Sequence, residues 1–344
     1  MMNNLNNPYF SVIIPCFNCR KTIERLLESL VNQFFDDMEV IIQDDGSTDN
    51  FMELVEPFKE KLNIKYFRNK PREVHCPSNT RQDGLENATG KWVTFIDHDD
   101  MFESNVFMEV KRCIEFNKER YLLVSDFREF NPETYEVLHI FDEPCTFWMH
   151  GKFYNRQFLI DYDIKFKEDL ISHEDHYFNQ LVFGYIAAIG VKYSILKQFT
   201  YRWMFYADST GKKMCEANEY GFGFIDRYYE DYLNALLEPL FMLYDKYPRM
   251  KDLISFKMTY VMLYAYFYYQ SLYYRRKFEH YLPNKIAFGN YLNKIKSTLG
   301  VTNYDIAMII YSDSDSFNSM RGKVFGTCGD MIEHDSFYTF IESF

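Results

Sequence analysis

The stretch WVTFIDHDD, residues 92–100, is the most informative part of this chain for its fold and its site. Its first five residues are apolar, β-branched or aromatic, which predicts a short buried strand. Three carboxylates then follow, Asp97, Asp99 and Asp100. Carboxylates this close raise one another's pKa unless a cation lies among them, and Mg²⁺ and Mn²⁺ take oxygen ligands. The stretch therefore predicts a strand that ends in a metal site, with a solvated acidic turn as the alternative.

Strand and helix patterns alternate before this stretch. Residues 11–15, 39–43 and 64–67 are short apolar runs that predict three strands. From Ile23 to Val31, apolar residues recur at the spacing of one helix face. Such alternation with short connections predicts an α/β fold in which a mostly parallel sheet is flanked by helices.

Two acidic clusters follow strands of this sheet. Asp44 and Asp45 come directly after the second strand, and residues 97–100 follow the fourth. Because an open parallel sheet binds its ligand at the carboxyl ends of its strands, we expect both clusters at one edge. No G-x-G-x-x-G and no phosphate-binding Gly-rich loop occurs, so dinucleotide and P-loop sites are excluded. Phosphate would instead contact a metal and basic side chains such as Arg81.

The middle of the chain adds a third acidic group. A helix is predicted over 102–119 and a strand over 121–126, and Glu174 and Asp175 precede an apolar helix over 177–183. The polar stretch 211–213 marks a domain boundary. We therefore divide the chain into residues 1–210 and a mainly helical C-terminal region, 211–344, of unknown role.

One hydrophobic segment of the C-terminal region permits two interpretations. Residues 258–269 are dense in apolar and aromatic side chains, but the run is shorter than the roughly 20 residues that span a membrane. Basic residues follow at 275–277. The segment is either a core helix of an appended bundle or a peripheral contact with a membrane surface.

Composition limits the classes of function. The net charge of −12 argues against a nucleic-acid partner, since phosphate contacts need a basic face. The first residues show neither a charged nor an apolar segment of a secretory signal. The seven cysteines are scattered, which is typical of a reducing compartment. We expect a cytoplasmic protein, with the inner face of the membrane as a second location.

The ordered motifs resemble a family 2 glycosyltransferase of the GT-A (Rossmann-like) fold over roughly residues 9–205. They are SVIIPCFN (11–18), DDGSTD (44–49), RQDG (81–84), ATGK (88–91), DHDD (97–100) and ED (174–175). Residues 151–175 are also similar to the bacterial polysaccharide and lipopolysaccharide branch. The resemblance implies a nucleotide-sugar half at about 9–126 and an acceptor half at about 127–210.

The resemblance also implies an activity and its partners. It implies an inverting, Mn²⁺- or Mg²⁺-dependent transfer of one hexosyl or N-acetylhexosaminyl group. The donor would be a nucleotide diphosphate sugar, with UDP as the expected nucleotide. The acceptor would be a hydroxyl of a glycan, a lipid-linked molecule or a protein, in surface polysaccharide or glycoconjugate synthesis.

Site residues carry over from the resemblance position by position. Asp175 would be the catalytic base, with Glu174 supporting the acceptor side. Asp99 would be the principal metal ligand, and Asp97 would reach ribose or metal. The nucleotide-sugar pocket would be formed by Pro15, Phe17, Asn18, Asp44, Asp45, Arg81, Asp97, His98 and Arg202. His98 is bulkier than the usual small residue between the acids. Arg202 lies in a Q-x-x-R-W-like segment that has one residue too many.

Two other functions are weighed against this one. A nucleotidyltransferase would normally carry a Gly-rich loop with a basic residue after the first strand, where this chain has CFNCR at 16–20. A catalytically inactive nucleotide-sugar-binding or scaffold protein of the same fold would be expected to lose Asp99 or Asp175. Both residues are present.

Overall fold

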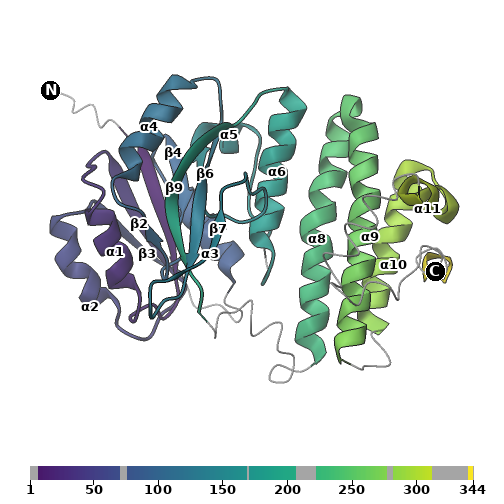
Figure 1. Ribbon diagram of the computed structural model, residues 1–344, viewed down its shortest axis with the longest axis horizontal. Helices are drawn as coiled ribbons and strands as arrows, with labels where there is room; N and C mark the ends of the chain where they lie inside the picture. The colour runs from purple at the N-terminus through teal and green to yellow at the C-terminus, as the bar shows by residue number, and fades with distance from the viewer. Residues whose placement is uncertain are drawn as a thin grey trace. The chain divides into compact units, whose positions relative to one another are not determined.

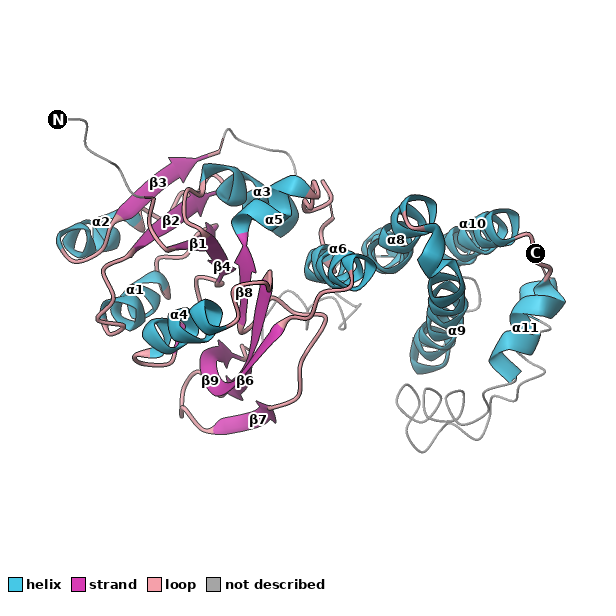
Figure 2. Ribbon diagram, turned by 90° about the horizontal axis from the view of Figure 1, so that it is seen from above, coloured by secondary structure: helices cyan, strands magenta, loops and turns pink. Residues whose placement is uncertain are grey.

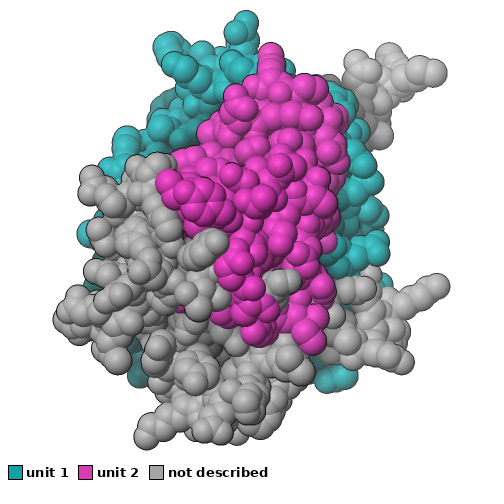
Figure 3. Space-filling model, turned by 90° about the vertical axis from the view of Figure 1, so that its right-hand side faces the viewer, with its two compact units in different colours: residues 1–213 teal, residues 214–344 magenta. Residues whose placement is uncertain are grey.

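The computed structural model describes residues 7–69, 76–168, 170–206, 222–276, 282–311 and 340–343. The chain forms two compact units, Met1–Lys213 and Met214–Phe344, which Figure 3 colours separately. The boundary predicted at residues 210–211 lies outside the described residues and stays a prediction.

A single mixed sheet organises the first unit (Figure 1). Its strand order is β3-β2-β1-β4-β8-β6-β9-β5, and β7 pairs with β6. The strands are β1 (Phe10–Cys16), β2 (Met38–Asp44), β3 (Ile64–Arg68), β4 (Trp92–Phe95), β5 (Met101–Phe102), β6 (Leu122–Phe130), β7 (Val137–Phe141), β8 (Lys152–Asn155) and β9 (Ser194–Met204). The four strands β3-β2-β1-β4 are all parallel, as predicted. Beyond β4 the sheet is mixed, with β8 antiparallel to both β4 and β6.

Helices cover both faces of the parallel half (Figure 2). They are α1 (Ile23–Val31), α2 (Met52–Val55), α3 (Pro77–Asn87), α4 (Val106–Phe116), α5 (Arg156–Asp161) and α6 (Glu174–Ile189). Alternate residues of β1 explain the two layers. Val12 and Ile14 join the buried cluster of α1 and α4, whereas Ile13 faces α3. There a Cβ on Gly84 would lie 2.5 Å from Ile13 Cγ2, so glycine permits this close approach.

Aromatic packing places α6 against β4. The rings of Phe166 and Phe178 stack with centroids 4.2 Å apart, and Phe95 of β4 lies 5.9 Å from Phe178. This packing brings the N-terminus of α6 to the end of β4, where the acidic stretch begins. The fold thereby joins the second and third acidic groups of the sequence.

Two predicted elements have different bounds in the structure. The helix predicted over 102–119 is shorter, because residues 101–102 form β5, which pairs with β9, and α4 covers only Val106–Phe116. The helix predicted over 177–183 begins at Glu174 and ends at Ile189. Glu174 and Asp175 therefore belong to its first turn.

The second unit is helical, as predicted. Its helices are α8 (Phe222–Lys246), α9 (Lys251–Arg276), α10 (Leu282–Leu299) and α11 (Asn303–Tyr311). In the segment 258–269, Met258, Met262 and Tyr266 are buried, which favours a core helix. None of the helices in the described ranges is long and apolar enough to cross a membrane. Of the predicted basic cluster, Lys277 lies outside the described residues, and membrane contact stays a prediction.

Candidate active site

The carboxyl ends of β1, β2 and β4 carry the residues predicted to form the donor pocket. Asn18, which has a φ of +52°, accepts a hydrogen bond from the backbone N–H of Thr48 at 2.9 Å. Its own N–H donates to the Ser47 hydroxyl at 2.9 Å. Pro15 lies within β1, and Phe17 is 39% exposed at its end. The loops after β1 and β2 are thus held together at the expected ligand edge.

Asp44 and Asp45 differ in their surroundings. The buried Asp44 carboxylate accepts hydrogen bonds from the Tyr66 hydroxyl at 2.7 Å and from the backbone N–H of Ser47 at 2.8 Å. It thereby links the end of β2 to β3 and to the loop that follows β2. Asp45 is also buried, and its Oδ1 accepts from the Asn69 amide at 3.2 Å. Their contacts to a nucleotide base stay predictions.

Arg81 joins the two acidic groups that the fold brings together. It extends from α3, is 6% exposed, and donates from Nη2 to Asp97 Oδ1 at 2.6 Å. Its Nη1 donates to the Glu174 carboxylate. Although burial opposes ionisation of Asp97, Arg81 holds the pKa of Asp97 below its usual value. One guanidinium therefore connects α3, the end of β4 and the first turn of α6.

Asp175 has the environment of a general base. Burial raises its pKa to about 6, although the charges of Arg81 and Lys152 and a hydrogen bond from the His176 backbone N–H at 2.8 Å oppose the rise. Burial also raises the pKa of Glu174, against the effect of Arg81. A carboxylate that titrates near pH 6 is mostly ionised at neutral pH, yet basic enough to accept a proton.

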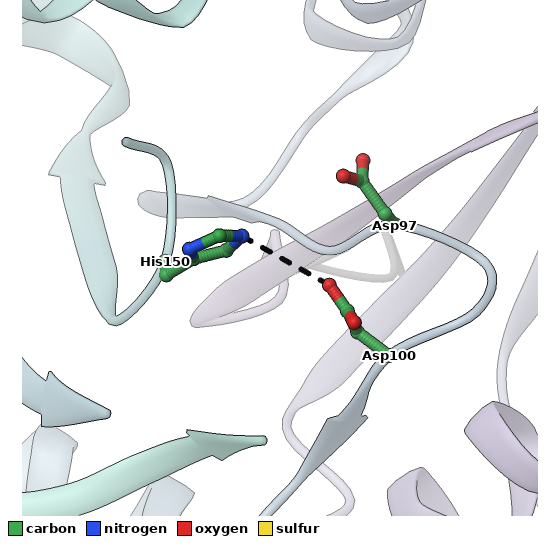
Figure 4. A group of neighbouring side chains, drawn as sticks. All are labelled: Asp97, Asp100 and His150. Carbon is green, nitrogen blue, oxygen red and sulfur yellow. Dashed lines mark ion pairs between the residues drawn. The ribbon is translucent and has the colours of Figure 1, made fainter. Parts of the chain in front are cut away.

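Three side chains near the end of β4 form a group that could hold a metal ion. Ligand atoms of Asp97, Asp100 and His150 lie within 4.8 Å of one another. Figure 4 shows His150 facing Asp100, with 4.0 Å between Nε2 and Oδ2. Burial lowers the pKa of His150 to about 3, so its ring is neutral and can donate a lone pair. Two carboxylates and a neutral imidazole suit Mn²⁺, so the residues fit the predicted metal.

The predicted principal ligand, Asp99, is not part of this group. Burial raises the pKa of Asp99, and the presence of Asp97 adds to this rise. Asp100, in contrast, is 2% exposed, and its oxygens accept from the Tyr201 hydroxyl at 2.5 Å and the Met204 N–H at 2.7 Å. Asp100 therefore ties the acidic loop to β9, and the metal role of Asp99 stays a prediction.

The last two predicted pocket residues contact other parts of the unit. His98 Nδ1 lies 2.8 Å from the Thr22 hydroxyl, at a distance for a hydrogen bond. Arg202 donates from Nη2 to Glu103 Oε2 at 2.5 Å, and Arg128 pairs with the same carboxylate. Arg202 is thus paired with Glu103 rather than with the carboxylates that Arg81 joins.

His150 and Lys152 are site residues that sequence reasoning missed. His150 lies just before β8, and Lys152 is the first residue of β8. Lys152 is fully buried beside α6. The only signal was the run WMHGK at 148–152, where two ionisable residues lie among apolar ones. Its meaning depends on β8 lying between β4 and β6, which the sequence pattern did not predict.

Comparisons with known proteins bear on the family and the fold of this chain. A model described as "Glycosyl transferase family 2" matches residues 11–170. The poly(ribitol-phosphate) beta-N-acetylglucosaminyltransferase TarS of Staphylococcus aureus is 32% identical over 184 residues, which are 49% of this chain and 31% of that protein. A Campylobacter jejuni GalNAc(5)-diNAcBac-PP-undecaprenol beta-1,3-glucosyltransferase is 39% identical over 94 residues, 27% of this chain and 30% of that protein. The matched regions thus span about a third of these relatives.

Solved structures share the fold. The crystal structure of S. aureus TarS 1–349 has a TM-score of 0.63 at 20% identity and covers 97% of this chain and 90% of that one. The same fragment has been solved with UDP and with UDP-GlcNAc. The mannosyltransferase PcManGT of Pyrobaculum calidifontis, solved with GDP-Man and Mn²⁺, has a TM-score of 0.50 at 13% identity, over 98% of this chain and 87% of that one. Residues 11–170, slightly under half of the chain, match the glycosyl transferase family 2 model, and the order of the motifs and the fold agree with that match.

Proposed function

We propose that this chain is an inverting, metal-dependent glycosyltransferase that moves one sugar from a UDP-sugar to an acceptor hydroxyl. One observation carries the proposal: Arg81 joins Asp97 at the end of β4 to Glu174 at the start of α6, and Asp175 lies in the same turn. A donor-side carboxylate and an acceptor-side base are thereby held next to each other. Neither a nucleotidyltransferase nor a simple binding module needs this pairing.

The chemistry follows from the positions of these groups. Asp175 accepts the proton of the acceptor hydroxyl as its oxygen attacks the anomeric carbon opposite the diphosphate, and the configuration inverts. Glu174, which accepts a hydrogen bond from Arg81, would support the acceptor side. Asp97 and Asp99 would hold the metal, which when bound offsets the charge that the leaving diphosphate gains. In the structure His150 lies with Asp97 and Asp100 rather than with Asp99, so it would supply a neutral nitrogen ligand beside Asp97.

The relatives support the choice of donor and acceptor. TarS is an N-acetylglucosaminyltransferase solved with UDP-GlcNAc, and the C. jejuni relative is a glucosyltransferase. We therefore expect UDP-GlcNAc or another UDP-hexose as donor. The names of these two relatives refer to a phosphate polymer and a lipid-linked glycan, which favours a glycan or lipid-linked acceptor here. We place the reaction in the cytoplasm, in surface glycan or glycoconjugate synthesis.

Calorimetric titration of UDP with and without Mn²⁺ is the first test. Metal-dependent binding is expected, followed by slow release of sugar from the matching UDP-sugar. Asp99→Ala is expected to remove the metal dependence of UDP binding. Asp175→Asn is expected to keep UDP binding and to lower transfer about 10²–10⁴-fold, the usual contribution of a general base. Binding of UDP without any donor hydrolysis or transfer would instead favour an inactive binding protein.

A further inference from the structure

Lys152 is a lysine with no exposure to solvent. It begins β8, its side chain is 0% exposed, and its Nζ donates a hydrogen bond to the carbonyl of Trp148. Burying an ammonium is costly unless an anion compensates its charge, and a backbone carbonyl is neutral. Among the carboxylates of the described residues, Asp175 is the one whose charge favours the protonated form of Lys152.

Hydrogen bonds connect Lys152 to the helix that carries Asp175. Asn179 of α6 donates from Nδ2 to the same Trp148 carbonyl at 3.2 Å, and its Oδ1 accepts from the Tyr154 hydroxyl at 2.8 Å. Lys152 and Tyr154 are two positions apart and point to the same face of β8. Asn179 follows Asp175 by four residues, so both lie on one face of α6. This network brings the ammonium and the proposed base onto facing surfaces.

Arg81 alone cannot neutralise the carboxylates around it. Its guanidinium carries one positive charge and already donates to Asp97 and Glu174, so Asp175 is a third carboxylate beside a single cation. The charges that act on Asp175 come from Arg81 of α3, Asp97 after β4 and Lys152 of β8, with Glu174 in its own turn. Arg81 and Lys152 favour its ionised form, and the carboxylates oppose it.

We propose that Lys152 is a positioning residue for the general base. Its buried ammonium balances the charge of Asp175, and its bond to the Trp148 carbonyl fixes α6 against β8. Asp175 is thereby kept ionised and in place for the acceptor hydroxyl. This inference rests on the proposed function, because it assigns Lys152 to the base of that reaction.

The test is a ¹³C NMR titration of the Asp175 carboxyl, assigned by its absence in Asp175→Asn. The wild-type midpoint is expected at about pH 6. Lys152→Met keeps the apolar volume but removes the charge, and should raise the midpoint by about 1–3 pH units. Lys152→Arg should stay near wild type, as should Lys118→Met, which changes an exposed lysine. An unchanged midpoint in Lys152→Met would overturn the proposal, as would equal shifts in the Met and Arg variants.

A second measurement covers the case in which Lys152→Met does not fold. The double variant Lys152→Met/Asp175→Asn removes both charges and is expected to regain a cooperative thermal transition, whereas failure to regain it counts against the pairing. In a folded Lys152→Met, the acid limb of kcat/KM for the acceptor should move to higher pH with the donor KM unchanged. Absence of transfer by the wild type would count against the proposed function, and the carboxyl titration would still decide the role of Lys152.

Discussion

Replacing Arg81 with methionine tests whether one guanidinium holds the acidic site together. The side chain is 6% exposed and contacts Asp97 at 2.6 Å as well as Glu174. Arg81→Met keeps much of the apolar volume and removes the charge and all of its donors. Asp97 and Glu174 then lie close together without their shared counter-ion.

The expected loss follows from the burial of these groups. Removing one partner of a buried ion pair costs about 3–5 kcal/mol, because it leaves an uncompensated charge. We expect the lower end, about 3 kcal/mol, since the Asp97 side chain is 40% exposed and screened by water. Glu174 also limits the loss, because burial already raises its pKa and it can take up a proton.

Urea unfolding followed by tryptophan fluorescence measures this loss of unfolding free energy in the compact unit that contains Arg81. All three tryptophans of the chain, Trp92, Trp148 and Trp203, lie in the first unit. Arg112→Met is the matched control: its pair with Glu109 has the same 2.6 Å separation, but the two side chains are 66% and 44% exposed. This control should lose less than about 1 kcal/mol.

The stabilisation by Arg81 should depend on pH in one direction. The pKa of Asp97 is lower in the folded state, so the stabilisation by Arg81 is present at neutral pH and is lost as pH falls through that lowered pKa. The wild type and Arg81→Met should therefore become more alike in acid. If Arg81→Met shifts the urea midpoint no more than Arg112→Met does, Arg81 is not the counter-ion of the site.

Three shorter predictions concern single positions. Because the pKa of Asp175 is about 6 in the protein without substrate, kcat/KM for the acceptor should fall about tenfold between pH 7 and pH 5, and a flat profile would point to another base. Asp100→Ala should lower the free energy of unfolding by about 1–3 kcal/mol, because buried donors of β9 lose their acceptor; an unchanged urea midpoint would contradict this role. Gly90→Ala should lower the free energy of unfolding by about 1–3 kcal/mol, because a Cβ would lie 2.6 Å from the Ser11 backbone nitrogen. If this variant unfolded at the same temperature as the wild type, the backbone would have moved to make room for the Cβ.

The parallel half of the fold could be predicted because its signals are local. Strands β1, β2 and β4 are mostly apolar runs because both faces of the sheet are buried there, whereas the edge strand β3 is only half-buried. The positions of Asp45 and Asp97 then follow from topology, because parallel strands end at the same edge. The fold class and the positions of the residues proposed to bind the donor can therefore be predicted from short stretches of sequence.

The acceptor side depends on contacts between distant residues. Strand β5 has only two residues and exists because it pairs with residues 201–202 of β9, so no local period predicts it. Helix α6 begins after His173, which has a φ of +59° and makes no side-chain cap hydrogen bond, so the usual start signal is missing. The apolar pattern therefore predicts the start of α6 at residue 177, three residues after its actual start at Glu174. Lys152 and His150 gain their meaning only from the non-local position of β8.

Charge balance explains why donor binding should require a metal. Around the ends of β4 and α6, Asp97, Glu174 and Asp175 face the cations Arg81 and Lys152, so the set carries no surplus positive charge. A nucleotide diphosphate adds further negative charge to the same edge. The single positive charge of Arg81 already offsets the buried carboxylates Asp97 and Glu174, so Arg81 offers a diphosphate no unshared charge. A divalent ion at the acidic loop would restore the balance, and UDP alone should therefore bind weakly.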